Sequence, residues 1–115
     1  MSRVDLARAA GQLRVRSERR GAVHDVAVSG ELDVATATSL ESELTAVEAG
    51  DADRIVIDLA GLEFIDCAGL GLILHADAHC GRGGGGRLTL LHGPPHIQRV
   101  FDMAAVADRL PFAAR

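Results

Sequence analysis

The sequence predicts a single α/β domain with a mostly parallel sheet of four to five strands and helices mainly on one face. Its 115 residues suffice for one hydrophobic core and are too few for two. Apolar runs rich in β-branched residues alternate with stretches of helical spacing, in the order β-β-α-β-α-β-α-β. No apolar run approaches the roughly 20 residues that a membrane-spanning helix needs, so no membrane association is expected.

The N-terminal part predicts an arm followed by two antiparallel strands. We expect residues 1–11 to form a loose N-terminal arm and residues 12–115 to form the domain. Apolar and charged residues alternate over Leu13–Arg16, which indicates a first strand ending in a turn over residues 17–21. Residues 22–30 then favour a second strand.

The middle of the chain predicts two helices around a buried strand. Asp33 stands where it would cap or precede a helix whose apolar face, at spacings of four and three, comprises Leu40, Leu44 and Val47. Residues 54–59 are apolar and β-branched, as in a buried strand. Asp66 follows at the start of a proline-free stretch, residues 68–80, where a carboxylate can cap a helix.

The C-terminal part predicts a strand, a helix and a last short strand. Glycines over residues 81–87 break the chain before a strand at residues 88–91. Pro95 suits the first turn of a helix, whose apolar face carries Ile97, Val100, Phe101 and Ala104. Residues 110–112 would form the last strand.

Charge and cysteine content restrict the classes of partner and compartment. Residues 24–77 hold twelve acids and one base, which disfavours nucleic acid as a partner and suits a basic protein. The two cysteines lie 13 positions apart without a disulfide framework, and the N-terminus lacks a signal-peptide pattern. We therefore expect a cytoplasmic protein.

Three patterns raise alternatives that the spacing does not favour. The letters G-x-G-x-x-G occur at Gly81, Gly83 and Gly86, but after a helix and before a strand, the reverse of a dinucleotide site. His75 and His79 have a metal-binding spacing without a second ligand cluster. No nucleophile–base–orienter set accompanies the carboxylates. We expect no cofactor, no metal and no enzyme activity.

Two motifs carry a family resemblance. The stretch Phe64–Gly71 resembles the signature of the STAS domain found in bacterial anti-sigma factor antagonists, apolar-Asp-Ser-Ser/Thr/Ala-Gly-Leu-Gly. Gly30–Asp33 matches the same family, and the likeness spans residues 13–112. STAS domains usually add a further helix after the last strand, so a C-terminal helix shortened or absent is expected here.

The resemblance implies a regulatory protein that sequesters an anti-sigma factor of the serine-kinase type and frees a sigma factor. In this family the first serine after the aspartate is phosphorylated, and the phosphate blocks the complex with the anti-sigma factor. Here the phosphoacceptor-equivalent position is Cys67, which has no hydroxyl. The partner-binding residues implied are Glu31, Asp33, Asp66, Cys67, Ala68 and Gly69.

Alternative interpretations of Cys67 remain open. It could be a small locally packed side chain, or the domain could be a non-phosphorylated sensor or scaffold that responds to a ligand or to thiol oxidation. A helix N-terminus lowers a thiol pKa, whereas the carboxylate of Asp66 opposes that effect, and a thiol titration separates the two cases. A homodimer is compatible with the sequence but not implied by it.

Overall fold

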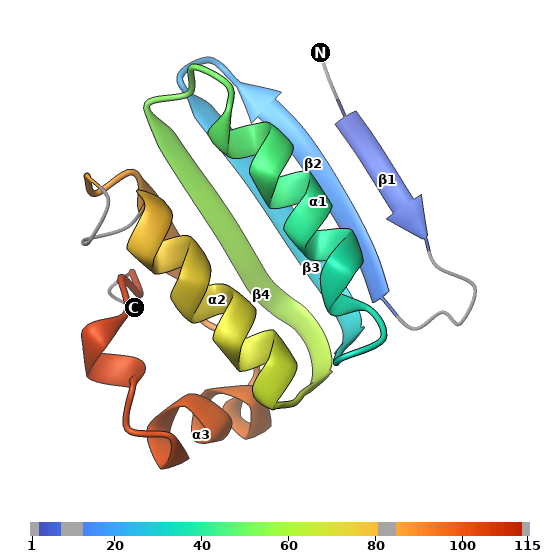
Figure 1. Ribbon diagram of the computed structural model, residues 1–115, viewed down its shortest axis with the longest axis vertical. Coiled ribbons are helices and arrows are strands. Elements are labelled where there is room, and N and C mark those ends of the chain that lie inside the picture. Colours follow the sequence, from blue (N-terminus) through green and yellow to red (C-terminus); the bar gives the residue numbers. More distant parts are fainter. Residues whose placement is uncertain (1–2, 8–12, 81–84, 114–115) are drawn as a thin grey trace.

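The computed structural model describes residues 3–7, 13–80 and 85–113 and shows a single α/β domain built on a five-stranded sheet (Figure 1). The sheet order is β1-β2-β3-β4-β5. The elements are β1 (Arg3–Ala7), β2 (Leu13–Arg20), β3 (Val23–Leu32), α1 (Ala37–Glu48), β4 (Arg54–Ile65), α2 (Cys67–Cys80), β5 (Leu88–Leu91), α3 (Pro95–Met103) and the 3-10 helix η2 (Ala107–Arg109).

The sheet is mixed. Strands β1, β2 and β3 pair antiparallel, whereas β3, β4 and β5 pair parallel. The predicted α/β class and the antiparallel first hairpin are confirmed, but parallel pairing is confined to the β3–β5 half of the sheet. This half places the carboxyl ends of β3 and β4 at the same edge.

The N-terminal residues differ from expectation. The backbone of residues 3–7 pairs with β2, from Arg3 opposite Glu18 to Ala7 opposite Arg14, so the loose arm was wrong for that stretch. Strand β2 also continues to Arg20, and the turn after it contracts to residues 21–22. Gly21 has a φ of 59°, which glycine adopts readily in a tight hairpin turn.

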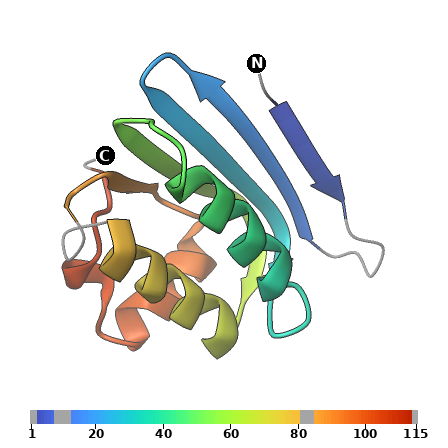
Figure 2. The same ribbon diagram turned by 45° about the horizontal axis from the view of Figure 1, so that its top comes forward.

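The core lies between one face of the sheet and the helices. Helices α1 and α2 pack beside each other over that face (Figures 1 and 2), as predicted. The predicted apolar face of α1 is confirmed, since it buries Leu40, Leu44 and Val47. Helix α3 packs against β4 and buries Ile97 and Phe101.

Strand β4 is twice as long as predicted and is irregular. It continues past residue 59 to Ile65, and its pairing with β3 shifts register twice. Each shift places one extra β4 residue opposite β3, first between Asp58 and Gly61 and then between Leu62 and Phe64. Such bulges re-aim the side chains that follow them.

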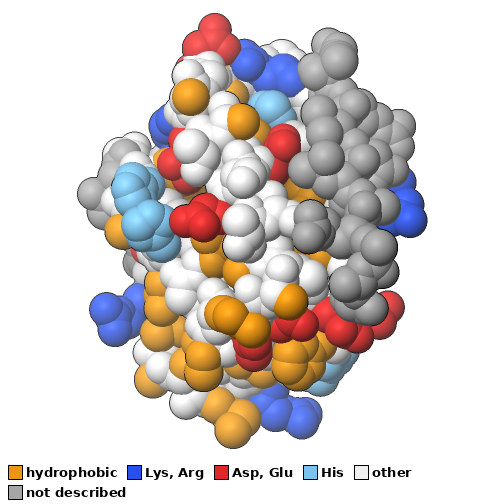
Figure 3. All heavy atoms as spheres, turned by 45° about the vertical axis from the view of Figure 1, so that its right-hand side comes forward, with side chains coloured by type: hydrophobic (Ala, Val, Ile, Leu, Met, Phe, Trp, Pro, Cys, Tyr) orange, Lys and Arg blue, Asp and Glu red, His pale blue; other side chains and the backbone are white. Residues whose placement is uncertain are grey.

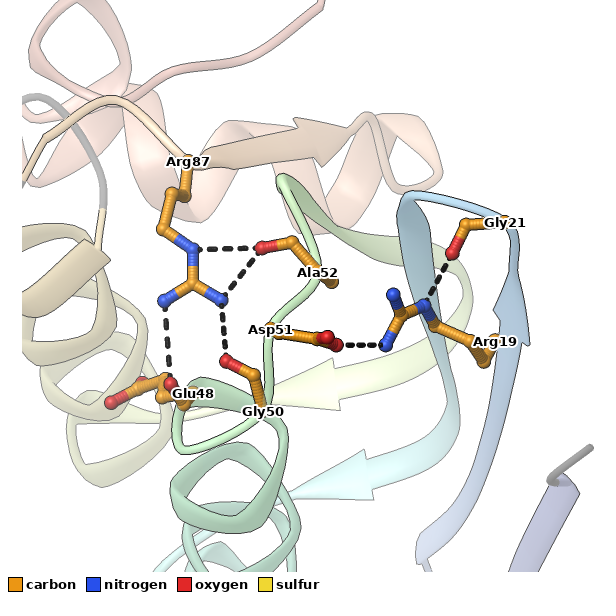
Figure 4. Close-up of polar contacts among 7 residues, drawn as sticks. All are labelled: Arg19, Gly21, Glu48, Gly50, Asp51, Ala52 and Arg87. Carbon is orange, nitrogen blue, oxygen red and sulfur yellow. Dashed lines mark hydrogen bonds and ion pairs between the residues drawn. The ribbon is translucent and has the colours of Figure 1, made fainter.

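An arginine closes the end of helix α1 from a distant part of the chain. The Arg87 guanidinium donates hydrogen bonds to the carbonyls of Glu48, Gly50 and Ala52, at distances of 2.9–3.4 Å (Figure 4). These groups include carbonyls that a helix C-terminus leaves without a partner inside the helix. Arg87 thereby fastens the start of β5 to the end of α1.

The C-terminal elements largely follow the prediction. Strand β5 covers residues 88–91, and Pro95 is the first residue of α3. The predicted last strand is reduced to one parallel bridge between Phe112 and Leu90, and the ring of Phe112 meets that of Phe101 edge-on. Among the described residues, no helix has the length and hydrophobicity that a membrane span requires.

Candidate functional site

Six residues implied by the sequence come together at the edge where β3 and β4 end. The two strands are parallel neighbours, with Leu32 opposite Ile65, so the loops that follow them run side by side. The Asp66 amide donates a hydrogen bond of 3.2 Å to the Leu32 carbonyl and ties one loop to the other. We call residues 31–36 and 63–69 the paired-loop surface. Sites commonly form at this edge of parallel strands.

Asp66 caps helix α2. Its Oδ1 accepts hydrogen bonds from the amides of Ala68, at 2.9 Å, and Gly69, at 3.1 Å. These are donors in the first turn of the helix, which have no partner inside the helix. The cap expected from the sequence is therefore present, and it fixes the turn on which the exposed side chain of Cys67 stands.

Asp33 holds the loop before α1 and is not the residue that caps the helix. Its Oδ1 accepts hydrogen bonds from the amides of Ala35 and Thr36, at 2.9 and 3.0 Å. Helix α1 begins only at Ala37. Of the two roles expected from the sequence, Asp33 therefore precedes the helix and shapes its entry.

Thr36 is a structural member of this loop that sequence reasoning missed. Its side chain is buried, and its hydroxyl donates a 2.8 Å hydrogen bond to the Glu31 carbonyl. The same oxygen accepts from the Asp33 amide at 3.0 Å. The spacing Asp-x-x-Thr was the available signal, because short polar side chains three apart often close a turn.

Gly69 allows the two loops to meet. A Cβ on this residue would lie 2.8 Å from the Leu32 carbonyl oxygen and 2.9 Å from Cγ1 of Ile65. Real Cβ atoms essentially never come so close, so any larger residue would push α2 away from β3. Gly71, one half-turn further along α2, meets nothing within 4 Å.

The paired-loop surface also exposes apolar and acidic side chains together. Val34 and Phe64 have 76% and 47% of their surface exposed. Glu63 is exposed and Glu31 is half-buried. Toward the lower end of the face in Figure 3, hydrophobic and acidic side chains lie next to one another. Neither a role for Val34 nor the exposure of Phe64 was predicted from the sequence.

The two cysteines lie in different environments. Cys67 is exposed at the paired-loop surface, whereas Cys80 is buried at the end of α2. Burial raises the pKa of the Cys80 thiol to about 11, and the nearby negative charge of Glu48 adds to the shift. Cys80 is therefore neutral near pH 7.

Two histidine pairings do not assemble a catalytic or metal site. The rings of His75 and His79 have centroids 4.2 Å apart, but no group of three or more metal-binding side chains occurs in the part of the chain that the structure describes. Ser17 Oγ and His24 Nε2 lie 2.6 Å apart, a pair absent from the sequence analysis. Ser17 is only 1% exposed and His24 is half-buried, so this hydrogen bond is partly buried. Gly81 and Gly83 lie outside the described residues.

Comparison with known proteins identifies related chains. The family model described as "Mlab, STAS domain" matches residues 15–111. The Anti-sigma F factor antagonist of Paenibacillus polymyxa is 30% identical over 100 residues, which cover 86% of this chain and 85% of that protein. The putative anti-sigma factor antagonist BtrV of Bordetella bronchiseptica is 34% identical over 87 residues, 75% of this chain and 73% of the relative. The crystal structure of an anti-sigma factor antagonist from Mycobacterium paratuberculosis superposes with a TM-score of 0.80 at 26% identity, covering 96% of this chain and 92% of that one.

Proposed function

Because this chain belongs to the STAS domain family, we propose that it is an anti-sigma factor antagonist, which binds an anti-sigma factor in the cytoplasm and so frees a sigma factor. The relatives that carry this name cover most of the chain. The observation that supports the proposal most is the paired-loop surface, where every residue implied by the family motif lies on one edge of the sheet. In the proposal this surface binds the partner.

We propose further that the partner is of the serine-kinase type but does not switch this protein off. Phosphorylation would add about two negative charges to the paired-loop surface and repel the partner. Cys67, at the position of the family's phosphoacceptor serine, has a thiol in place of the hydroxyl. Ala68 cannot accept phosphate either, so the complex is expected to persist in the presence of ATP.

Capture followed by reconstitution tests the proposed function. The full chain is used to capture proteins from an extract of its native cell, and any anti-sigma factor found is purified with its sigma factor. We expect the chain to bind the purified anti-sigma factor and to displace the sigma factor from it. Binding without displacement, or failure to bind any anti-sigma factor of that cell, would contradict the proposal.

In this proposal the protein acts by binding and has no turnover of its own. Its named relatives are regulatory antagonists. Pure protein incubated with ATP or GTP is expected to release no phosphate above the blank. Hydrolysis that a single point substitution in this chain abolishes would overturn the expectation.

A further inference from the structure

We propose that Val34 and Phe64 are the apolar anchors of the paired-loop surface, and that Glu31 and Glu63 beside them select a partner surface bearing arginine or lysine around an apolar pocket. This inference rests on the proposed function and specifies how the same surface recognises the anti-sigma factor.

The second bulge in β4 exposes Phe64. In a regular strand, residues alternate between the two faces, so Phe64 would follow the buried Leu62 into the core. The extra residue between Leu62 and Phe64 interrupts that alternation. Glu63 and Phe64 are consequently both exposed, and the next inward side chain is Ile65. The backbone thus directs an aromatic ring toward solvent beside the cap of α2.

Half of the exposed large hydrophobic residues lie at this surface. Among the described residues, four large hydrophobic side chains are exposed, and two of them, Val34 and Phe64, lie on the paired loops. Phe64 is also the register partner of Glu31 on the neighbouring strand. An aromatic side chain that becomes fully buried in a complex commonly contributes a large share of the affinity.

The two glutamates are the acidic residues whose carboxylates do not hold the loops. Asp33 Oδ1 accepts hydrogen bonds from two backbone amides of its own loop, and Asp66 Oδ1 accepts from two amides in the first turn of α2. The carboxylates of Glu31 and Glu63, in contrast, have no hydrogen-bond or ion-pair partner among the described residues. They can meet an incoming cation without breaking a turn. Acidic residues around an apolar anchor speed association with a basic surface and disfavour acidic partners.

Alanine substitutions separate the anchors from the rest of the surface. With the purified anti-sigma factor described above, Phe64→Ala and Val34→Ala are each expected to weaken binding at least about tenfold, mainly through faster dissociation. Leu91→Ala is the matched control. Leu91 is also exposed, at 37%, but it lies on β5, opposite Asp58 of β4, and is not part of the paired-loop surface. This substitution should change the dissociation constant less than about twofold.

Charge substitutions test the second part of the inference. Glu63→Gln is expected to slow association and to flatten its dependence on salt, and Glu31→Gln should do the same. Each variant is checked for an unchanged melting temperature. Because the side chain of Val34 is 76% exposed, its removal should not disturb folding. Wild-type affinity for both Phe64→Ala and Val34→Ala would overturn this inference alone. A wild-type chain that binds no anti-sigma factor would overturn the proposed function as well.

Discussion

Gly69 and Asp66 act on the same turn by different physical means. The carboxylate of Asp66 satisfies two amides of the first turn of α2, whereas the missing side chain of Gly69 lets that turn touch the carbonyl of Leu32. Both residues belong to the motif that the sequence analysis singled out. Their roles are structural in this chain, and they hold Cys67 and the exposed side chains around it in place.

Two glycines of α2 provide a matched pair of substitutions. Gly69→Ala is expected to lower the free energy of unfolding by about 1–3 kcal/mol, because its Cβ would meet a backbone oxygen at 2.8 Å. Gly71→Ala meets open space and should raise the free energy of unfolding by up to about 1 kcal/mol through helix propensity. Urea denaturation measures both, and equal effects would contradict the close approach.

The side chain at position 67 is expected to decide whether phosphorylation can switch this protein off. Cys67→Ser places a hydroxyl on an exposed turn with little change in size, so a serine-kinase partner with ATP is expected to add one phosphate to this variant and none to the native chain. Intact mass spectrometry reads the outcome. Cys67→Ala is the control that also lacks an acceptor. A phosphate on the native chain, mapped to Cys67, would contradict the expectation.

At the level of elements, regular patterns were predictable and irregular pairing was not. Helix α1 and strand β5 follow directly from apolar spacing, and Pro95 marks the start of α3. The extension of β4 was missed because Ala60–Gly61 reads as a strand end. Gly61 instead continues the strand beside Ser29, whose Cβ would lie 2.7 Å from a Cβ on Gly61. That glycine is used for close strand approach and does not end the strand.

The link between Arg87 and helix α1 was also beyond sequence reasoning. Arg87 lies 35 to 39 positions from its carbonyl acceptors, and no local pattern announces such a contact. The sequence, through the family resemblance, grouped the residues of the two loops as one partner-binding set, but it did not predict that neighbouring parallel strands bring these loops together. It could not show which carboxylates hold the loops, since this depends on the hydrogen bonds to Asp33 and Asp66.

Removing the Arg87 guanidinium should loosen the end of α1. Arg87→Ala leaves the carbonyls of Glu48, Gly50 and Ala52 to water, and the free energy of unfolding is expected to fall by about 1–3 kcal/mol. Arg54→Ala is the control, because the hydrogen bond from the Arg54 guanidinium to Thr89 is exposed and its loss should cost less than about 0.5 kcal/mol. Equal losses in chemical denaturation would show that Arg87 has no special role.

Over the whole molecule, the composition leaves an unusually simple titration above pH 9. The chain contains no lysine and no tyrosine, and arginine stays charged in this range. No lysine or tyrosine titration therefore overlaps with that of the Cys80 thiol. Since burial raises the pKa of Cys80 from 9.0 to about 11, the folded protein retains this proton after the unfolded chain has lost it.

The stability of the protein should consequently fall between pH 9 and pH 11. A thiol whose folded pKa is raised contributes stability that is fully present below pH 9 and is lost as the pH rises through 11, because the unfolded state binds fewer protons in that window. Urea denaturation at several pH values in the Cys67→Ser background isolates Cys80. Between pH 9 and pH 11 we expect the free energy of unfolding to fall less steeply in the Cys67→Ser, Cys80→Ala chain than in the Cys67→Ser chain. This comparison of slopes holds whatever the stability of each chain at pH 8. An equal decline in both chains would show that the proton on Cys80 does not stabilise the fold.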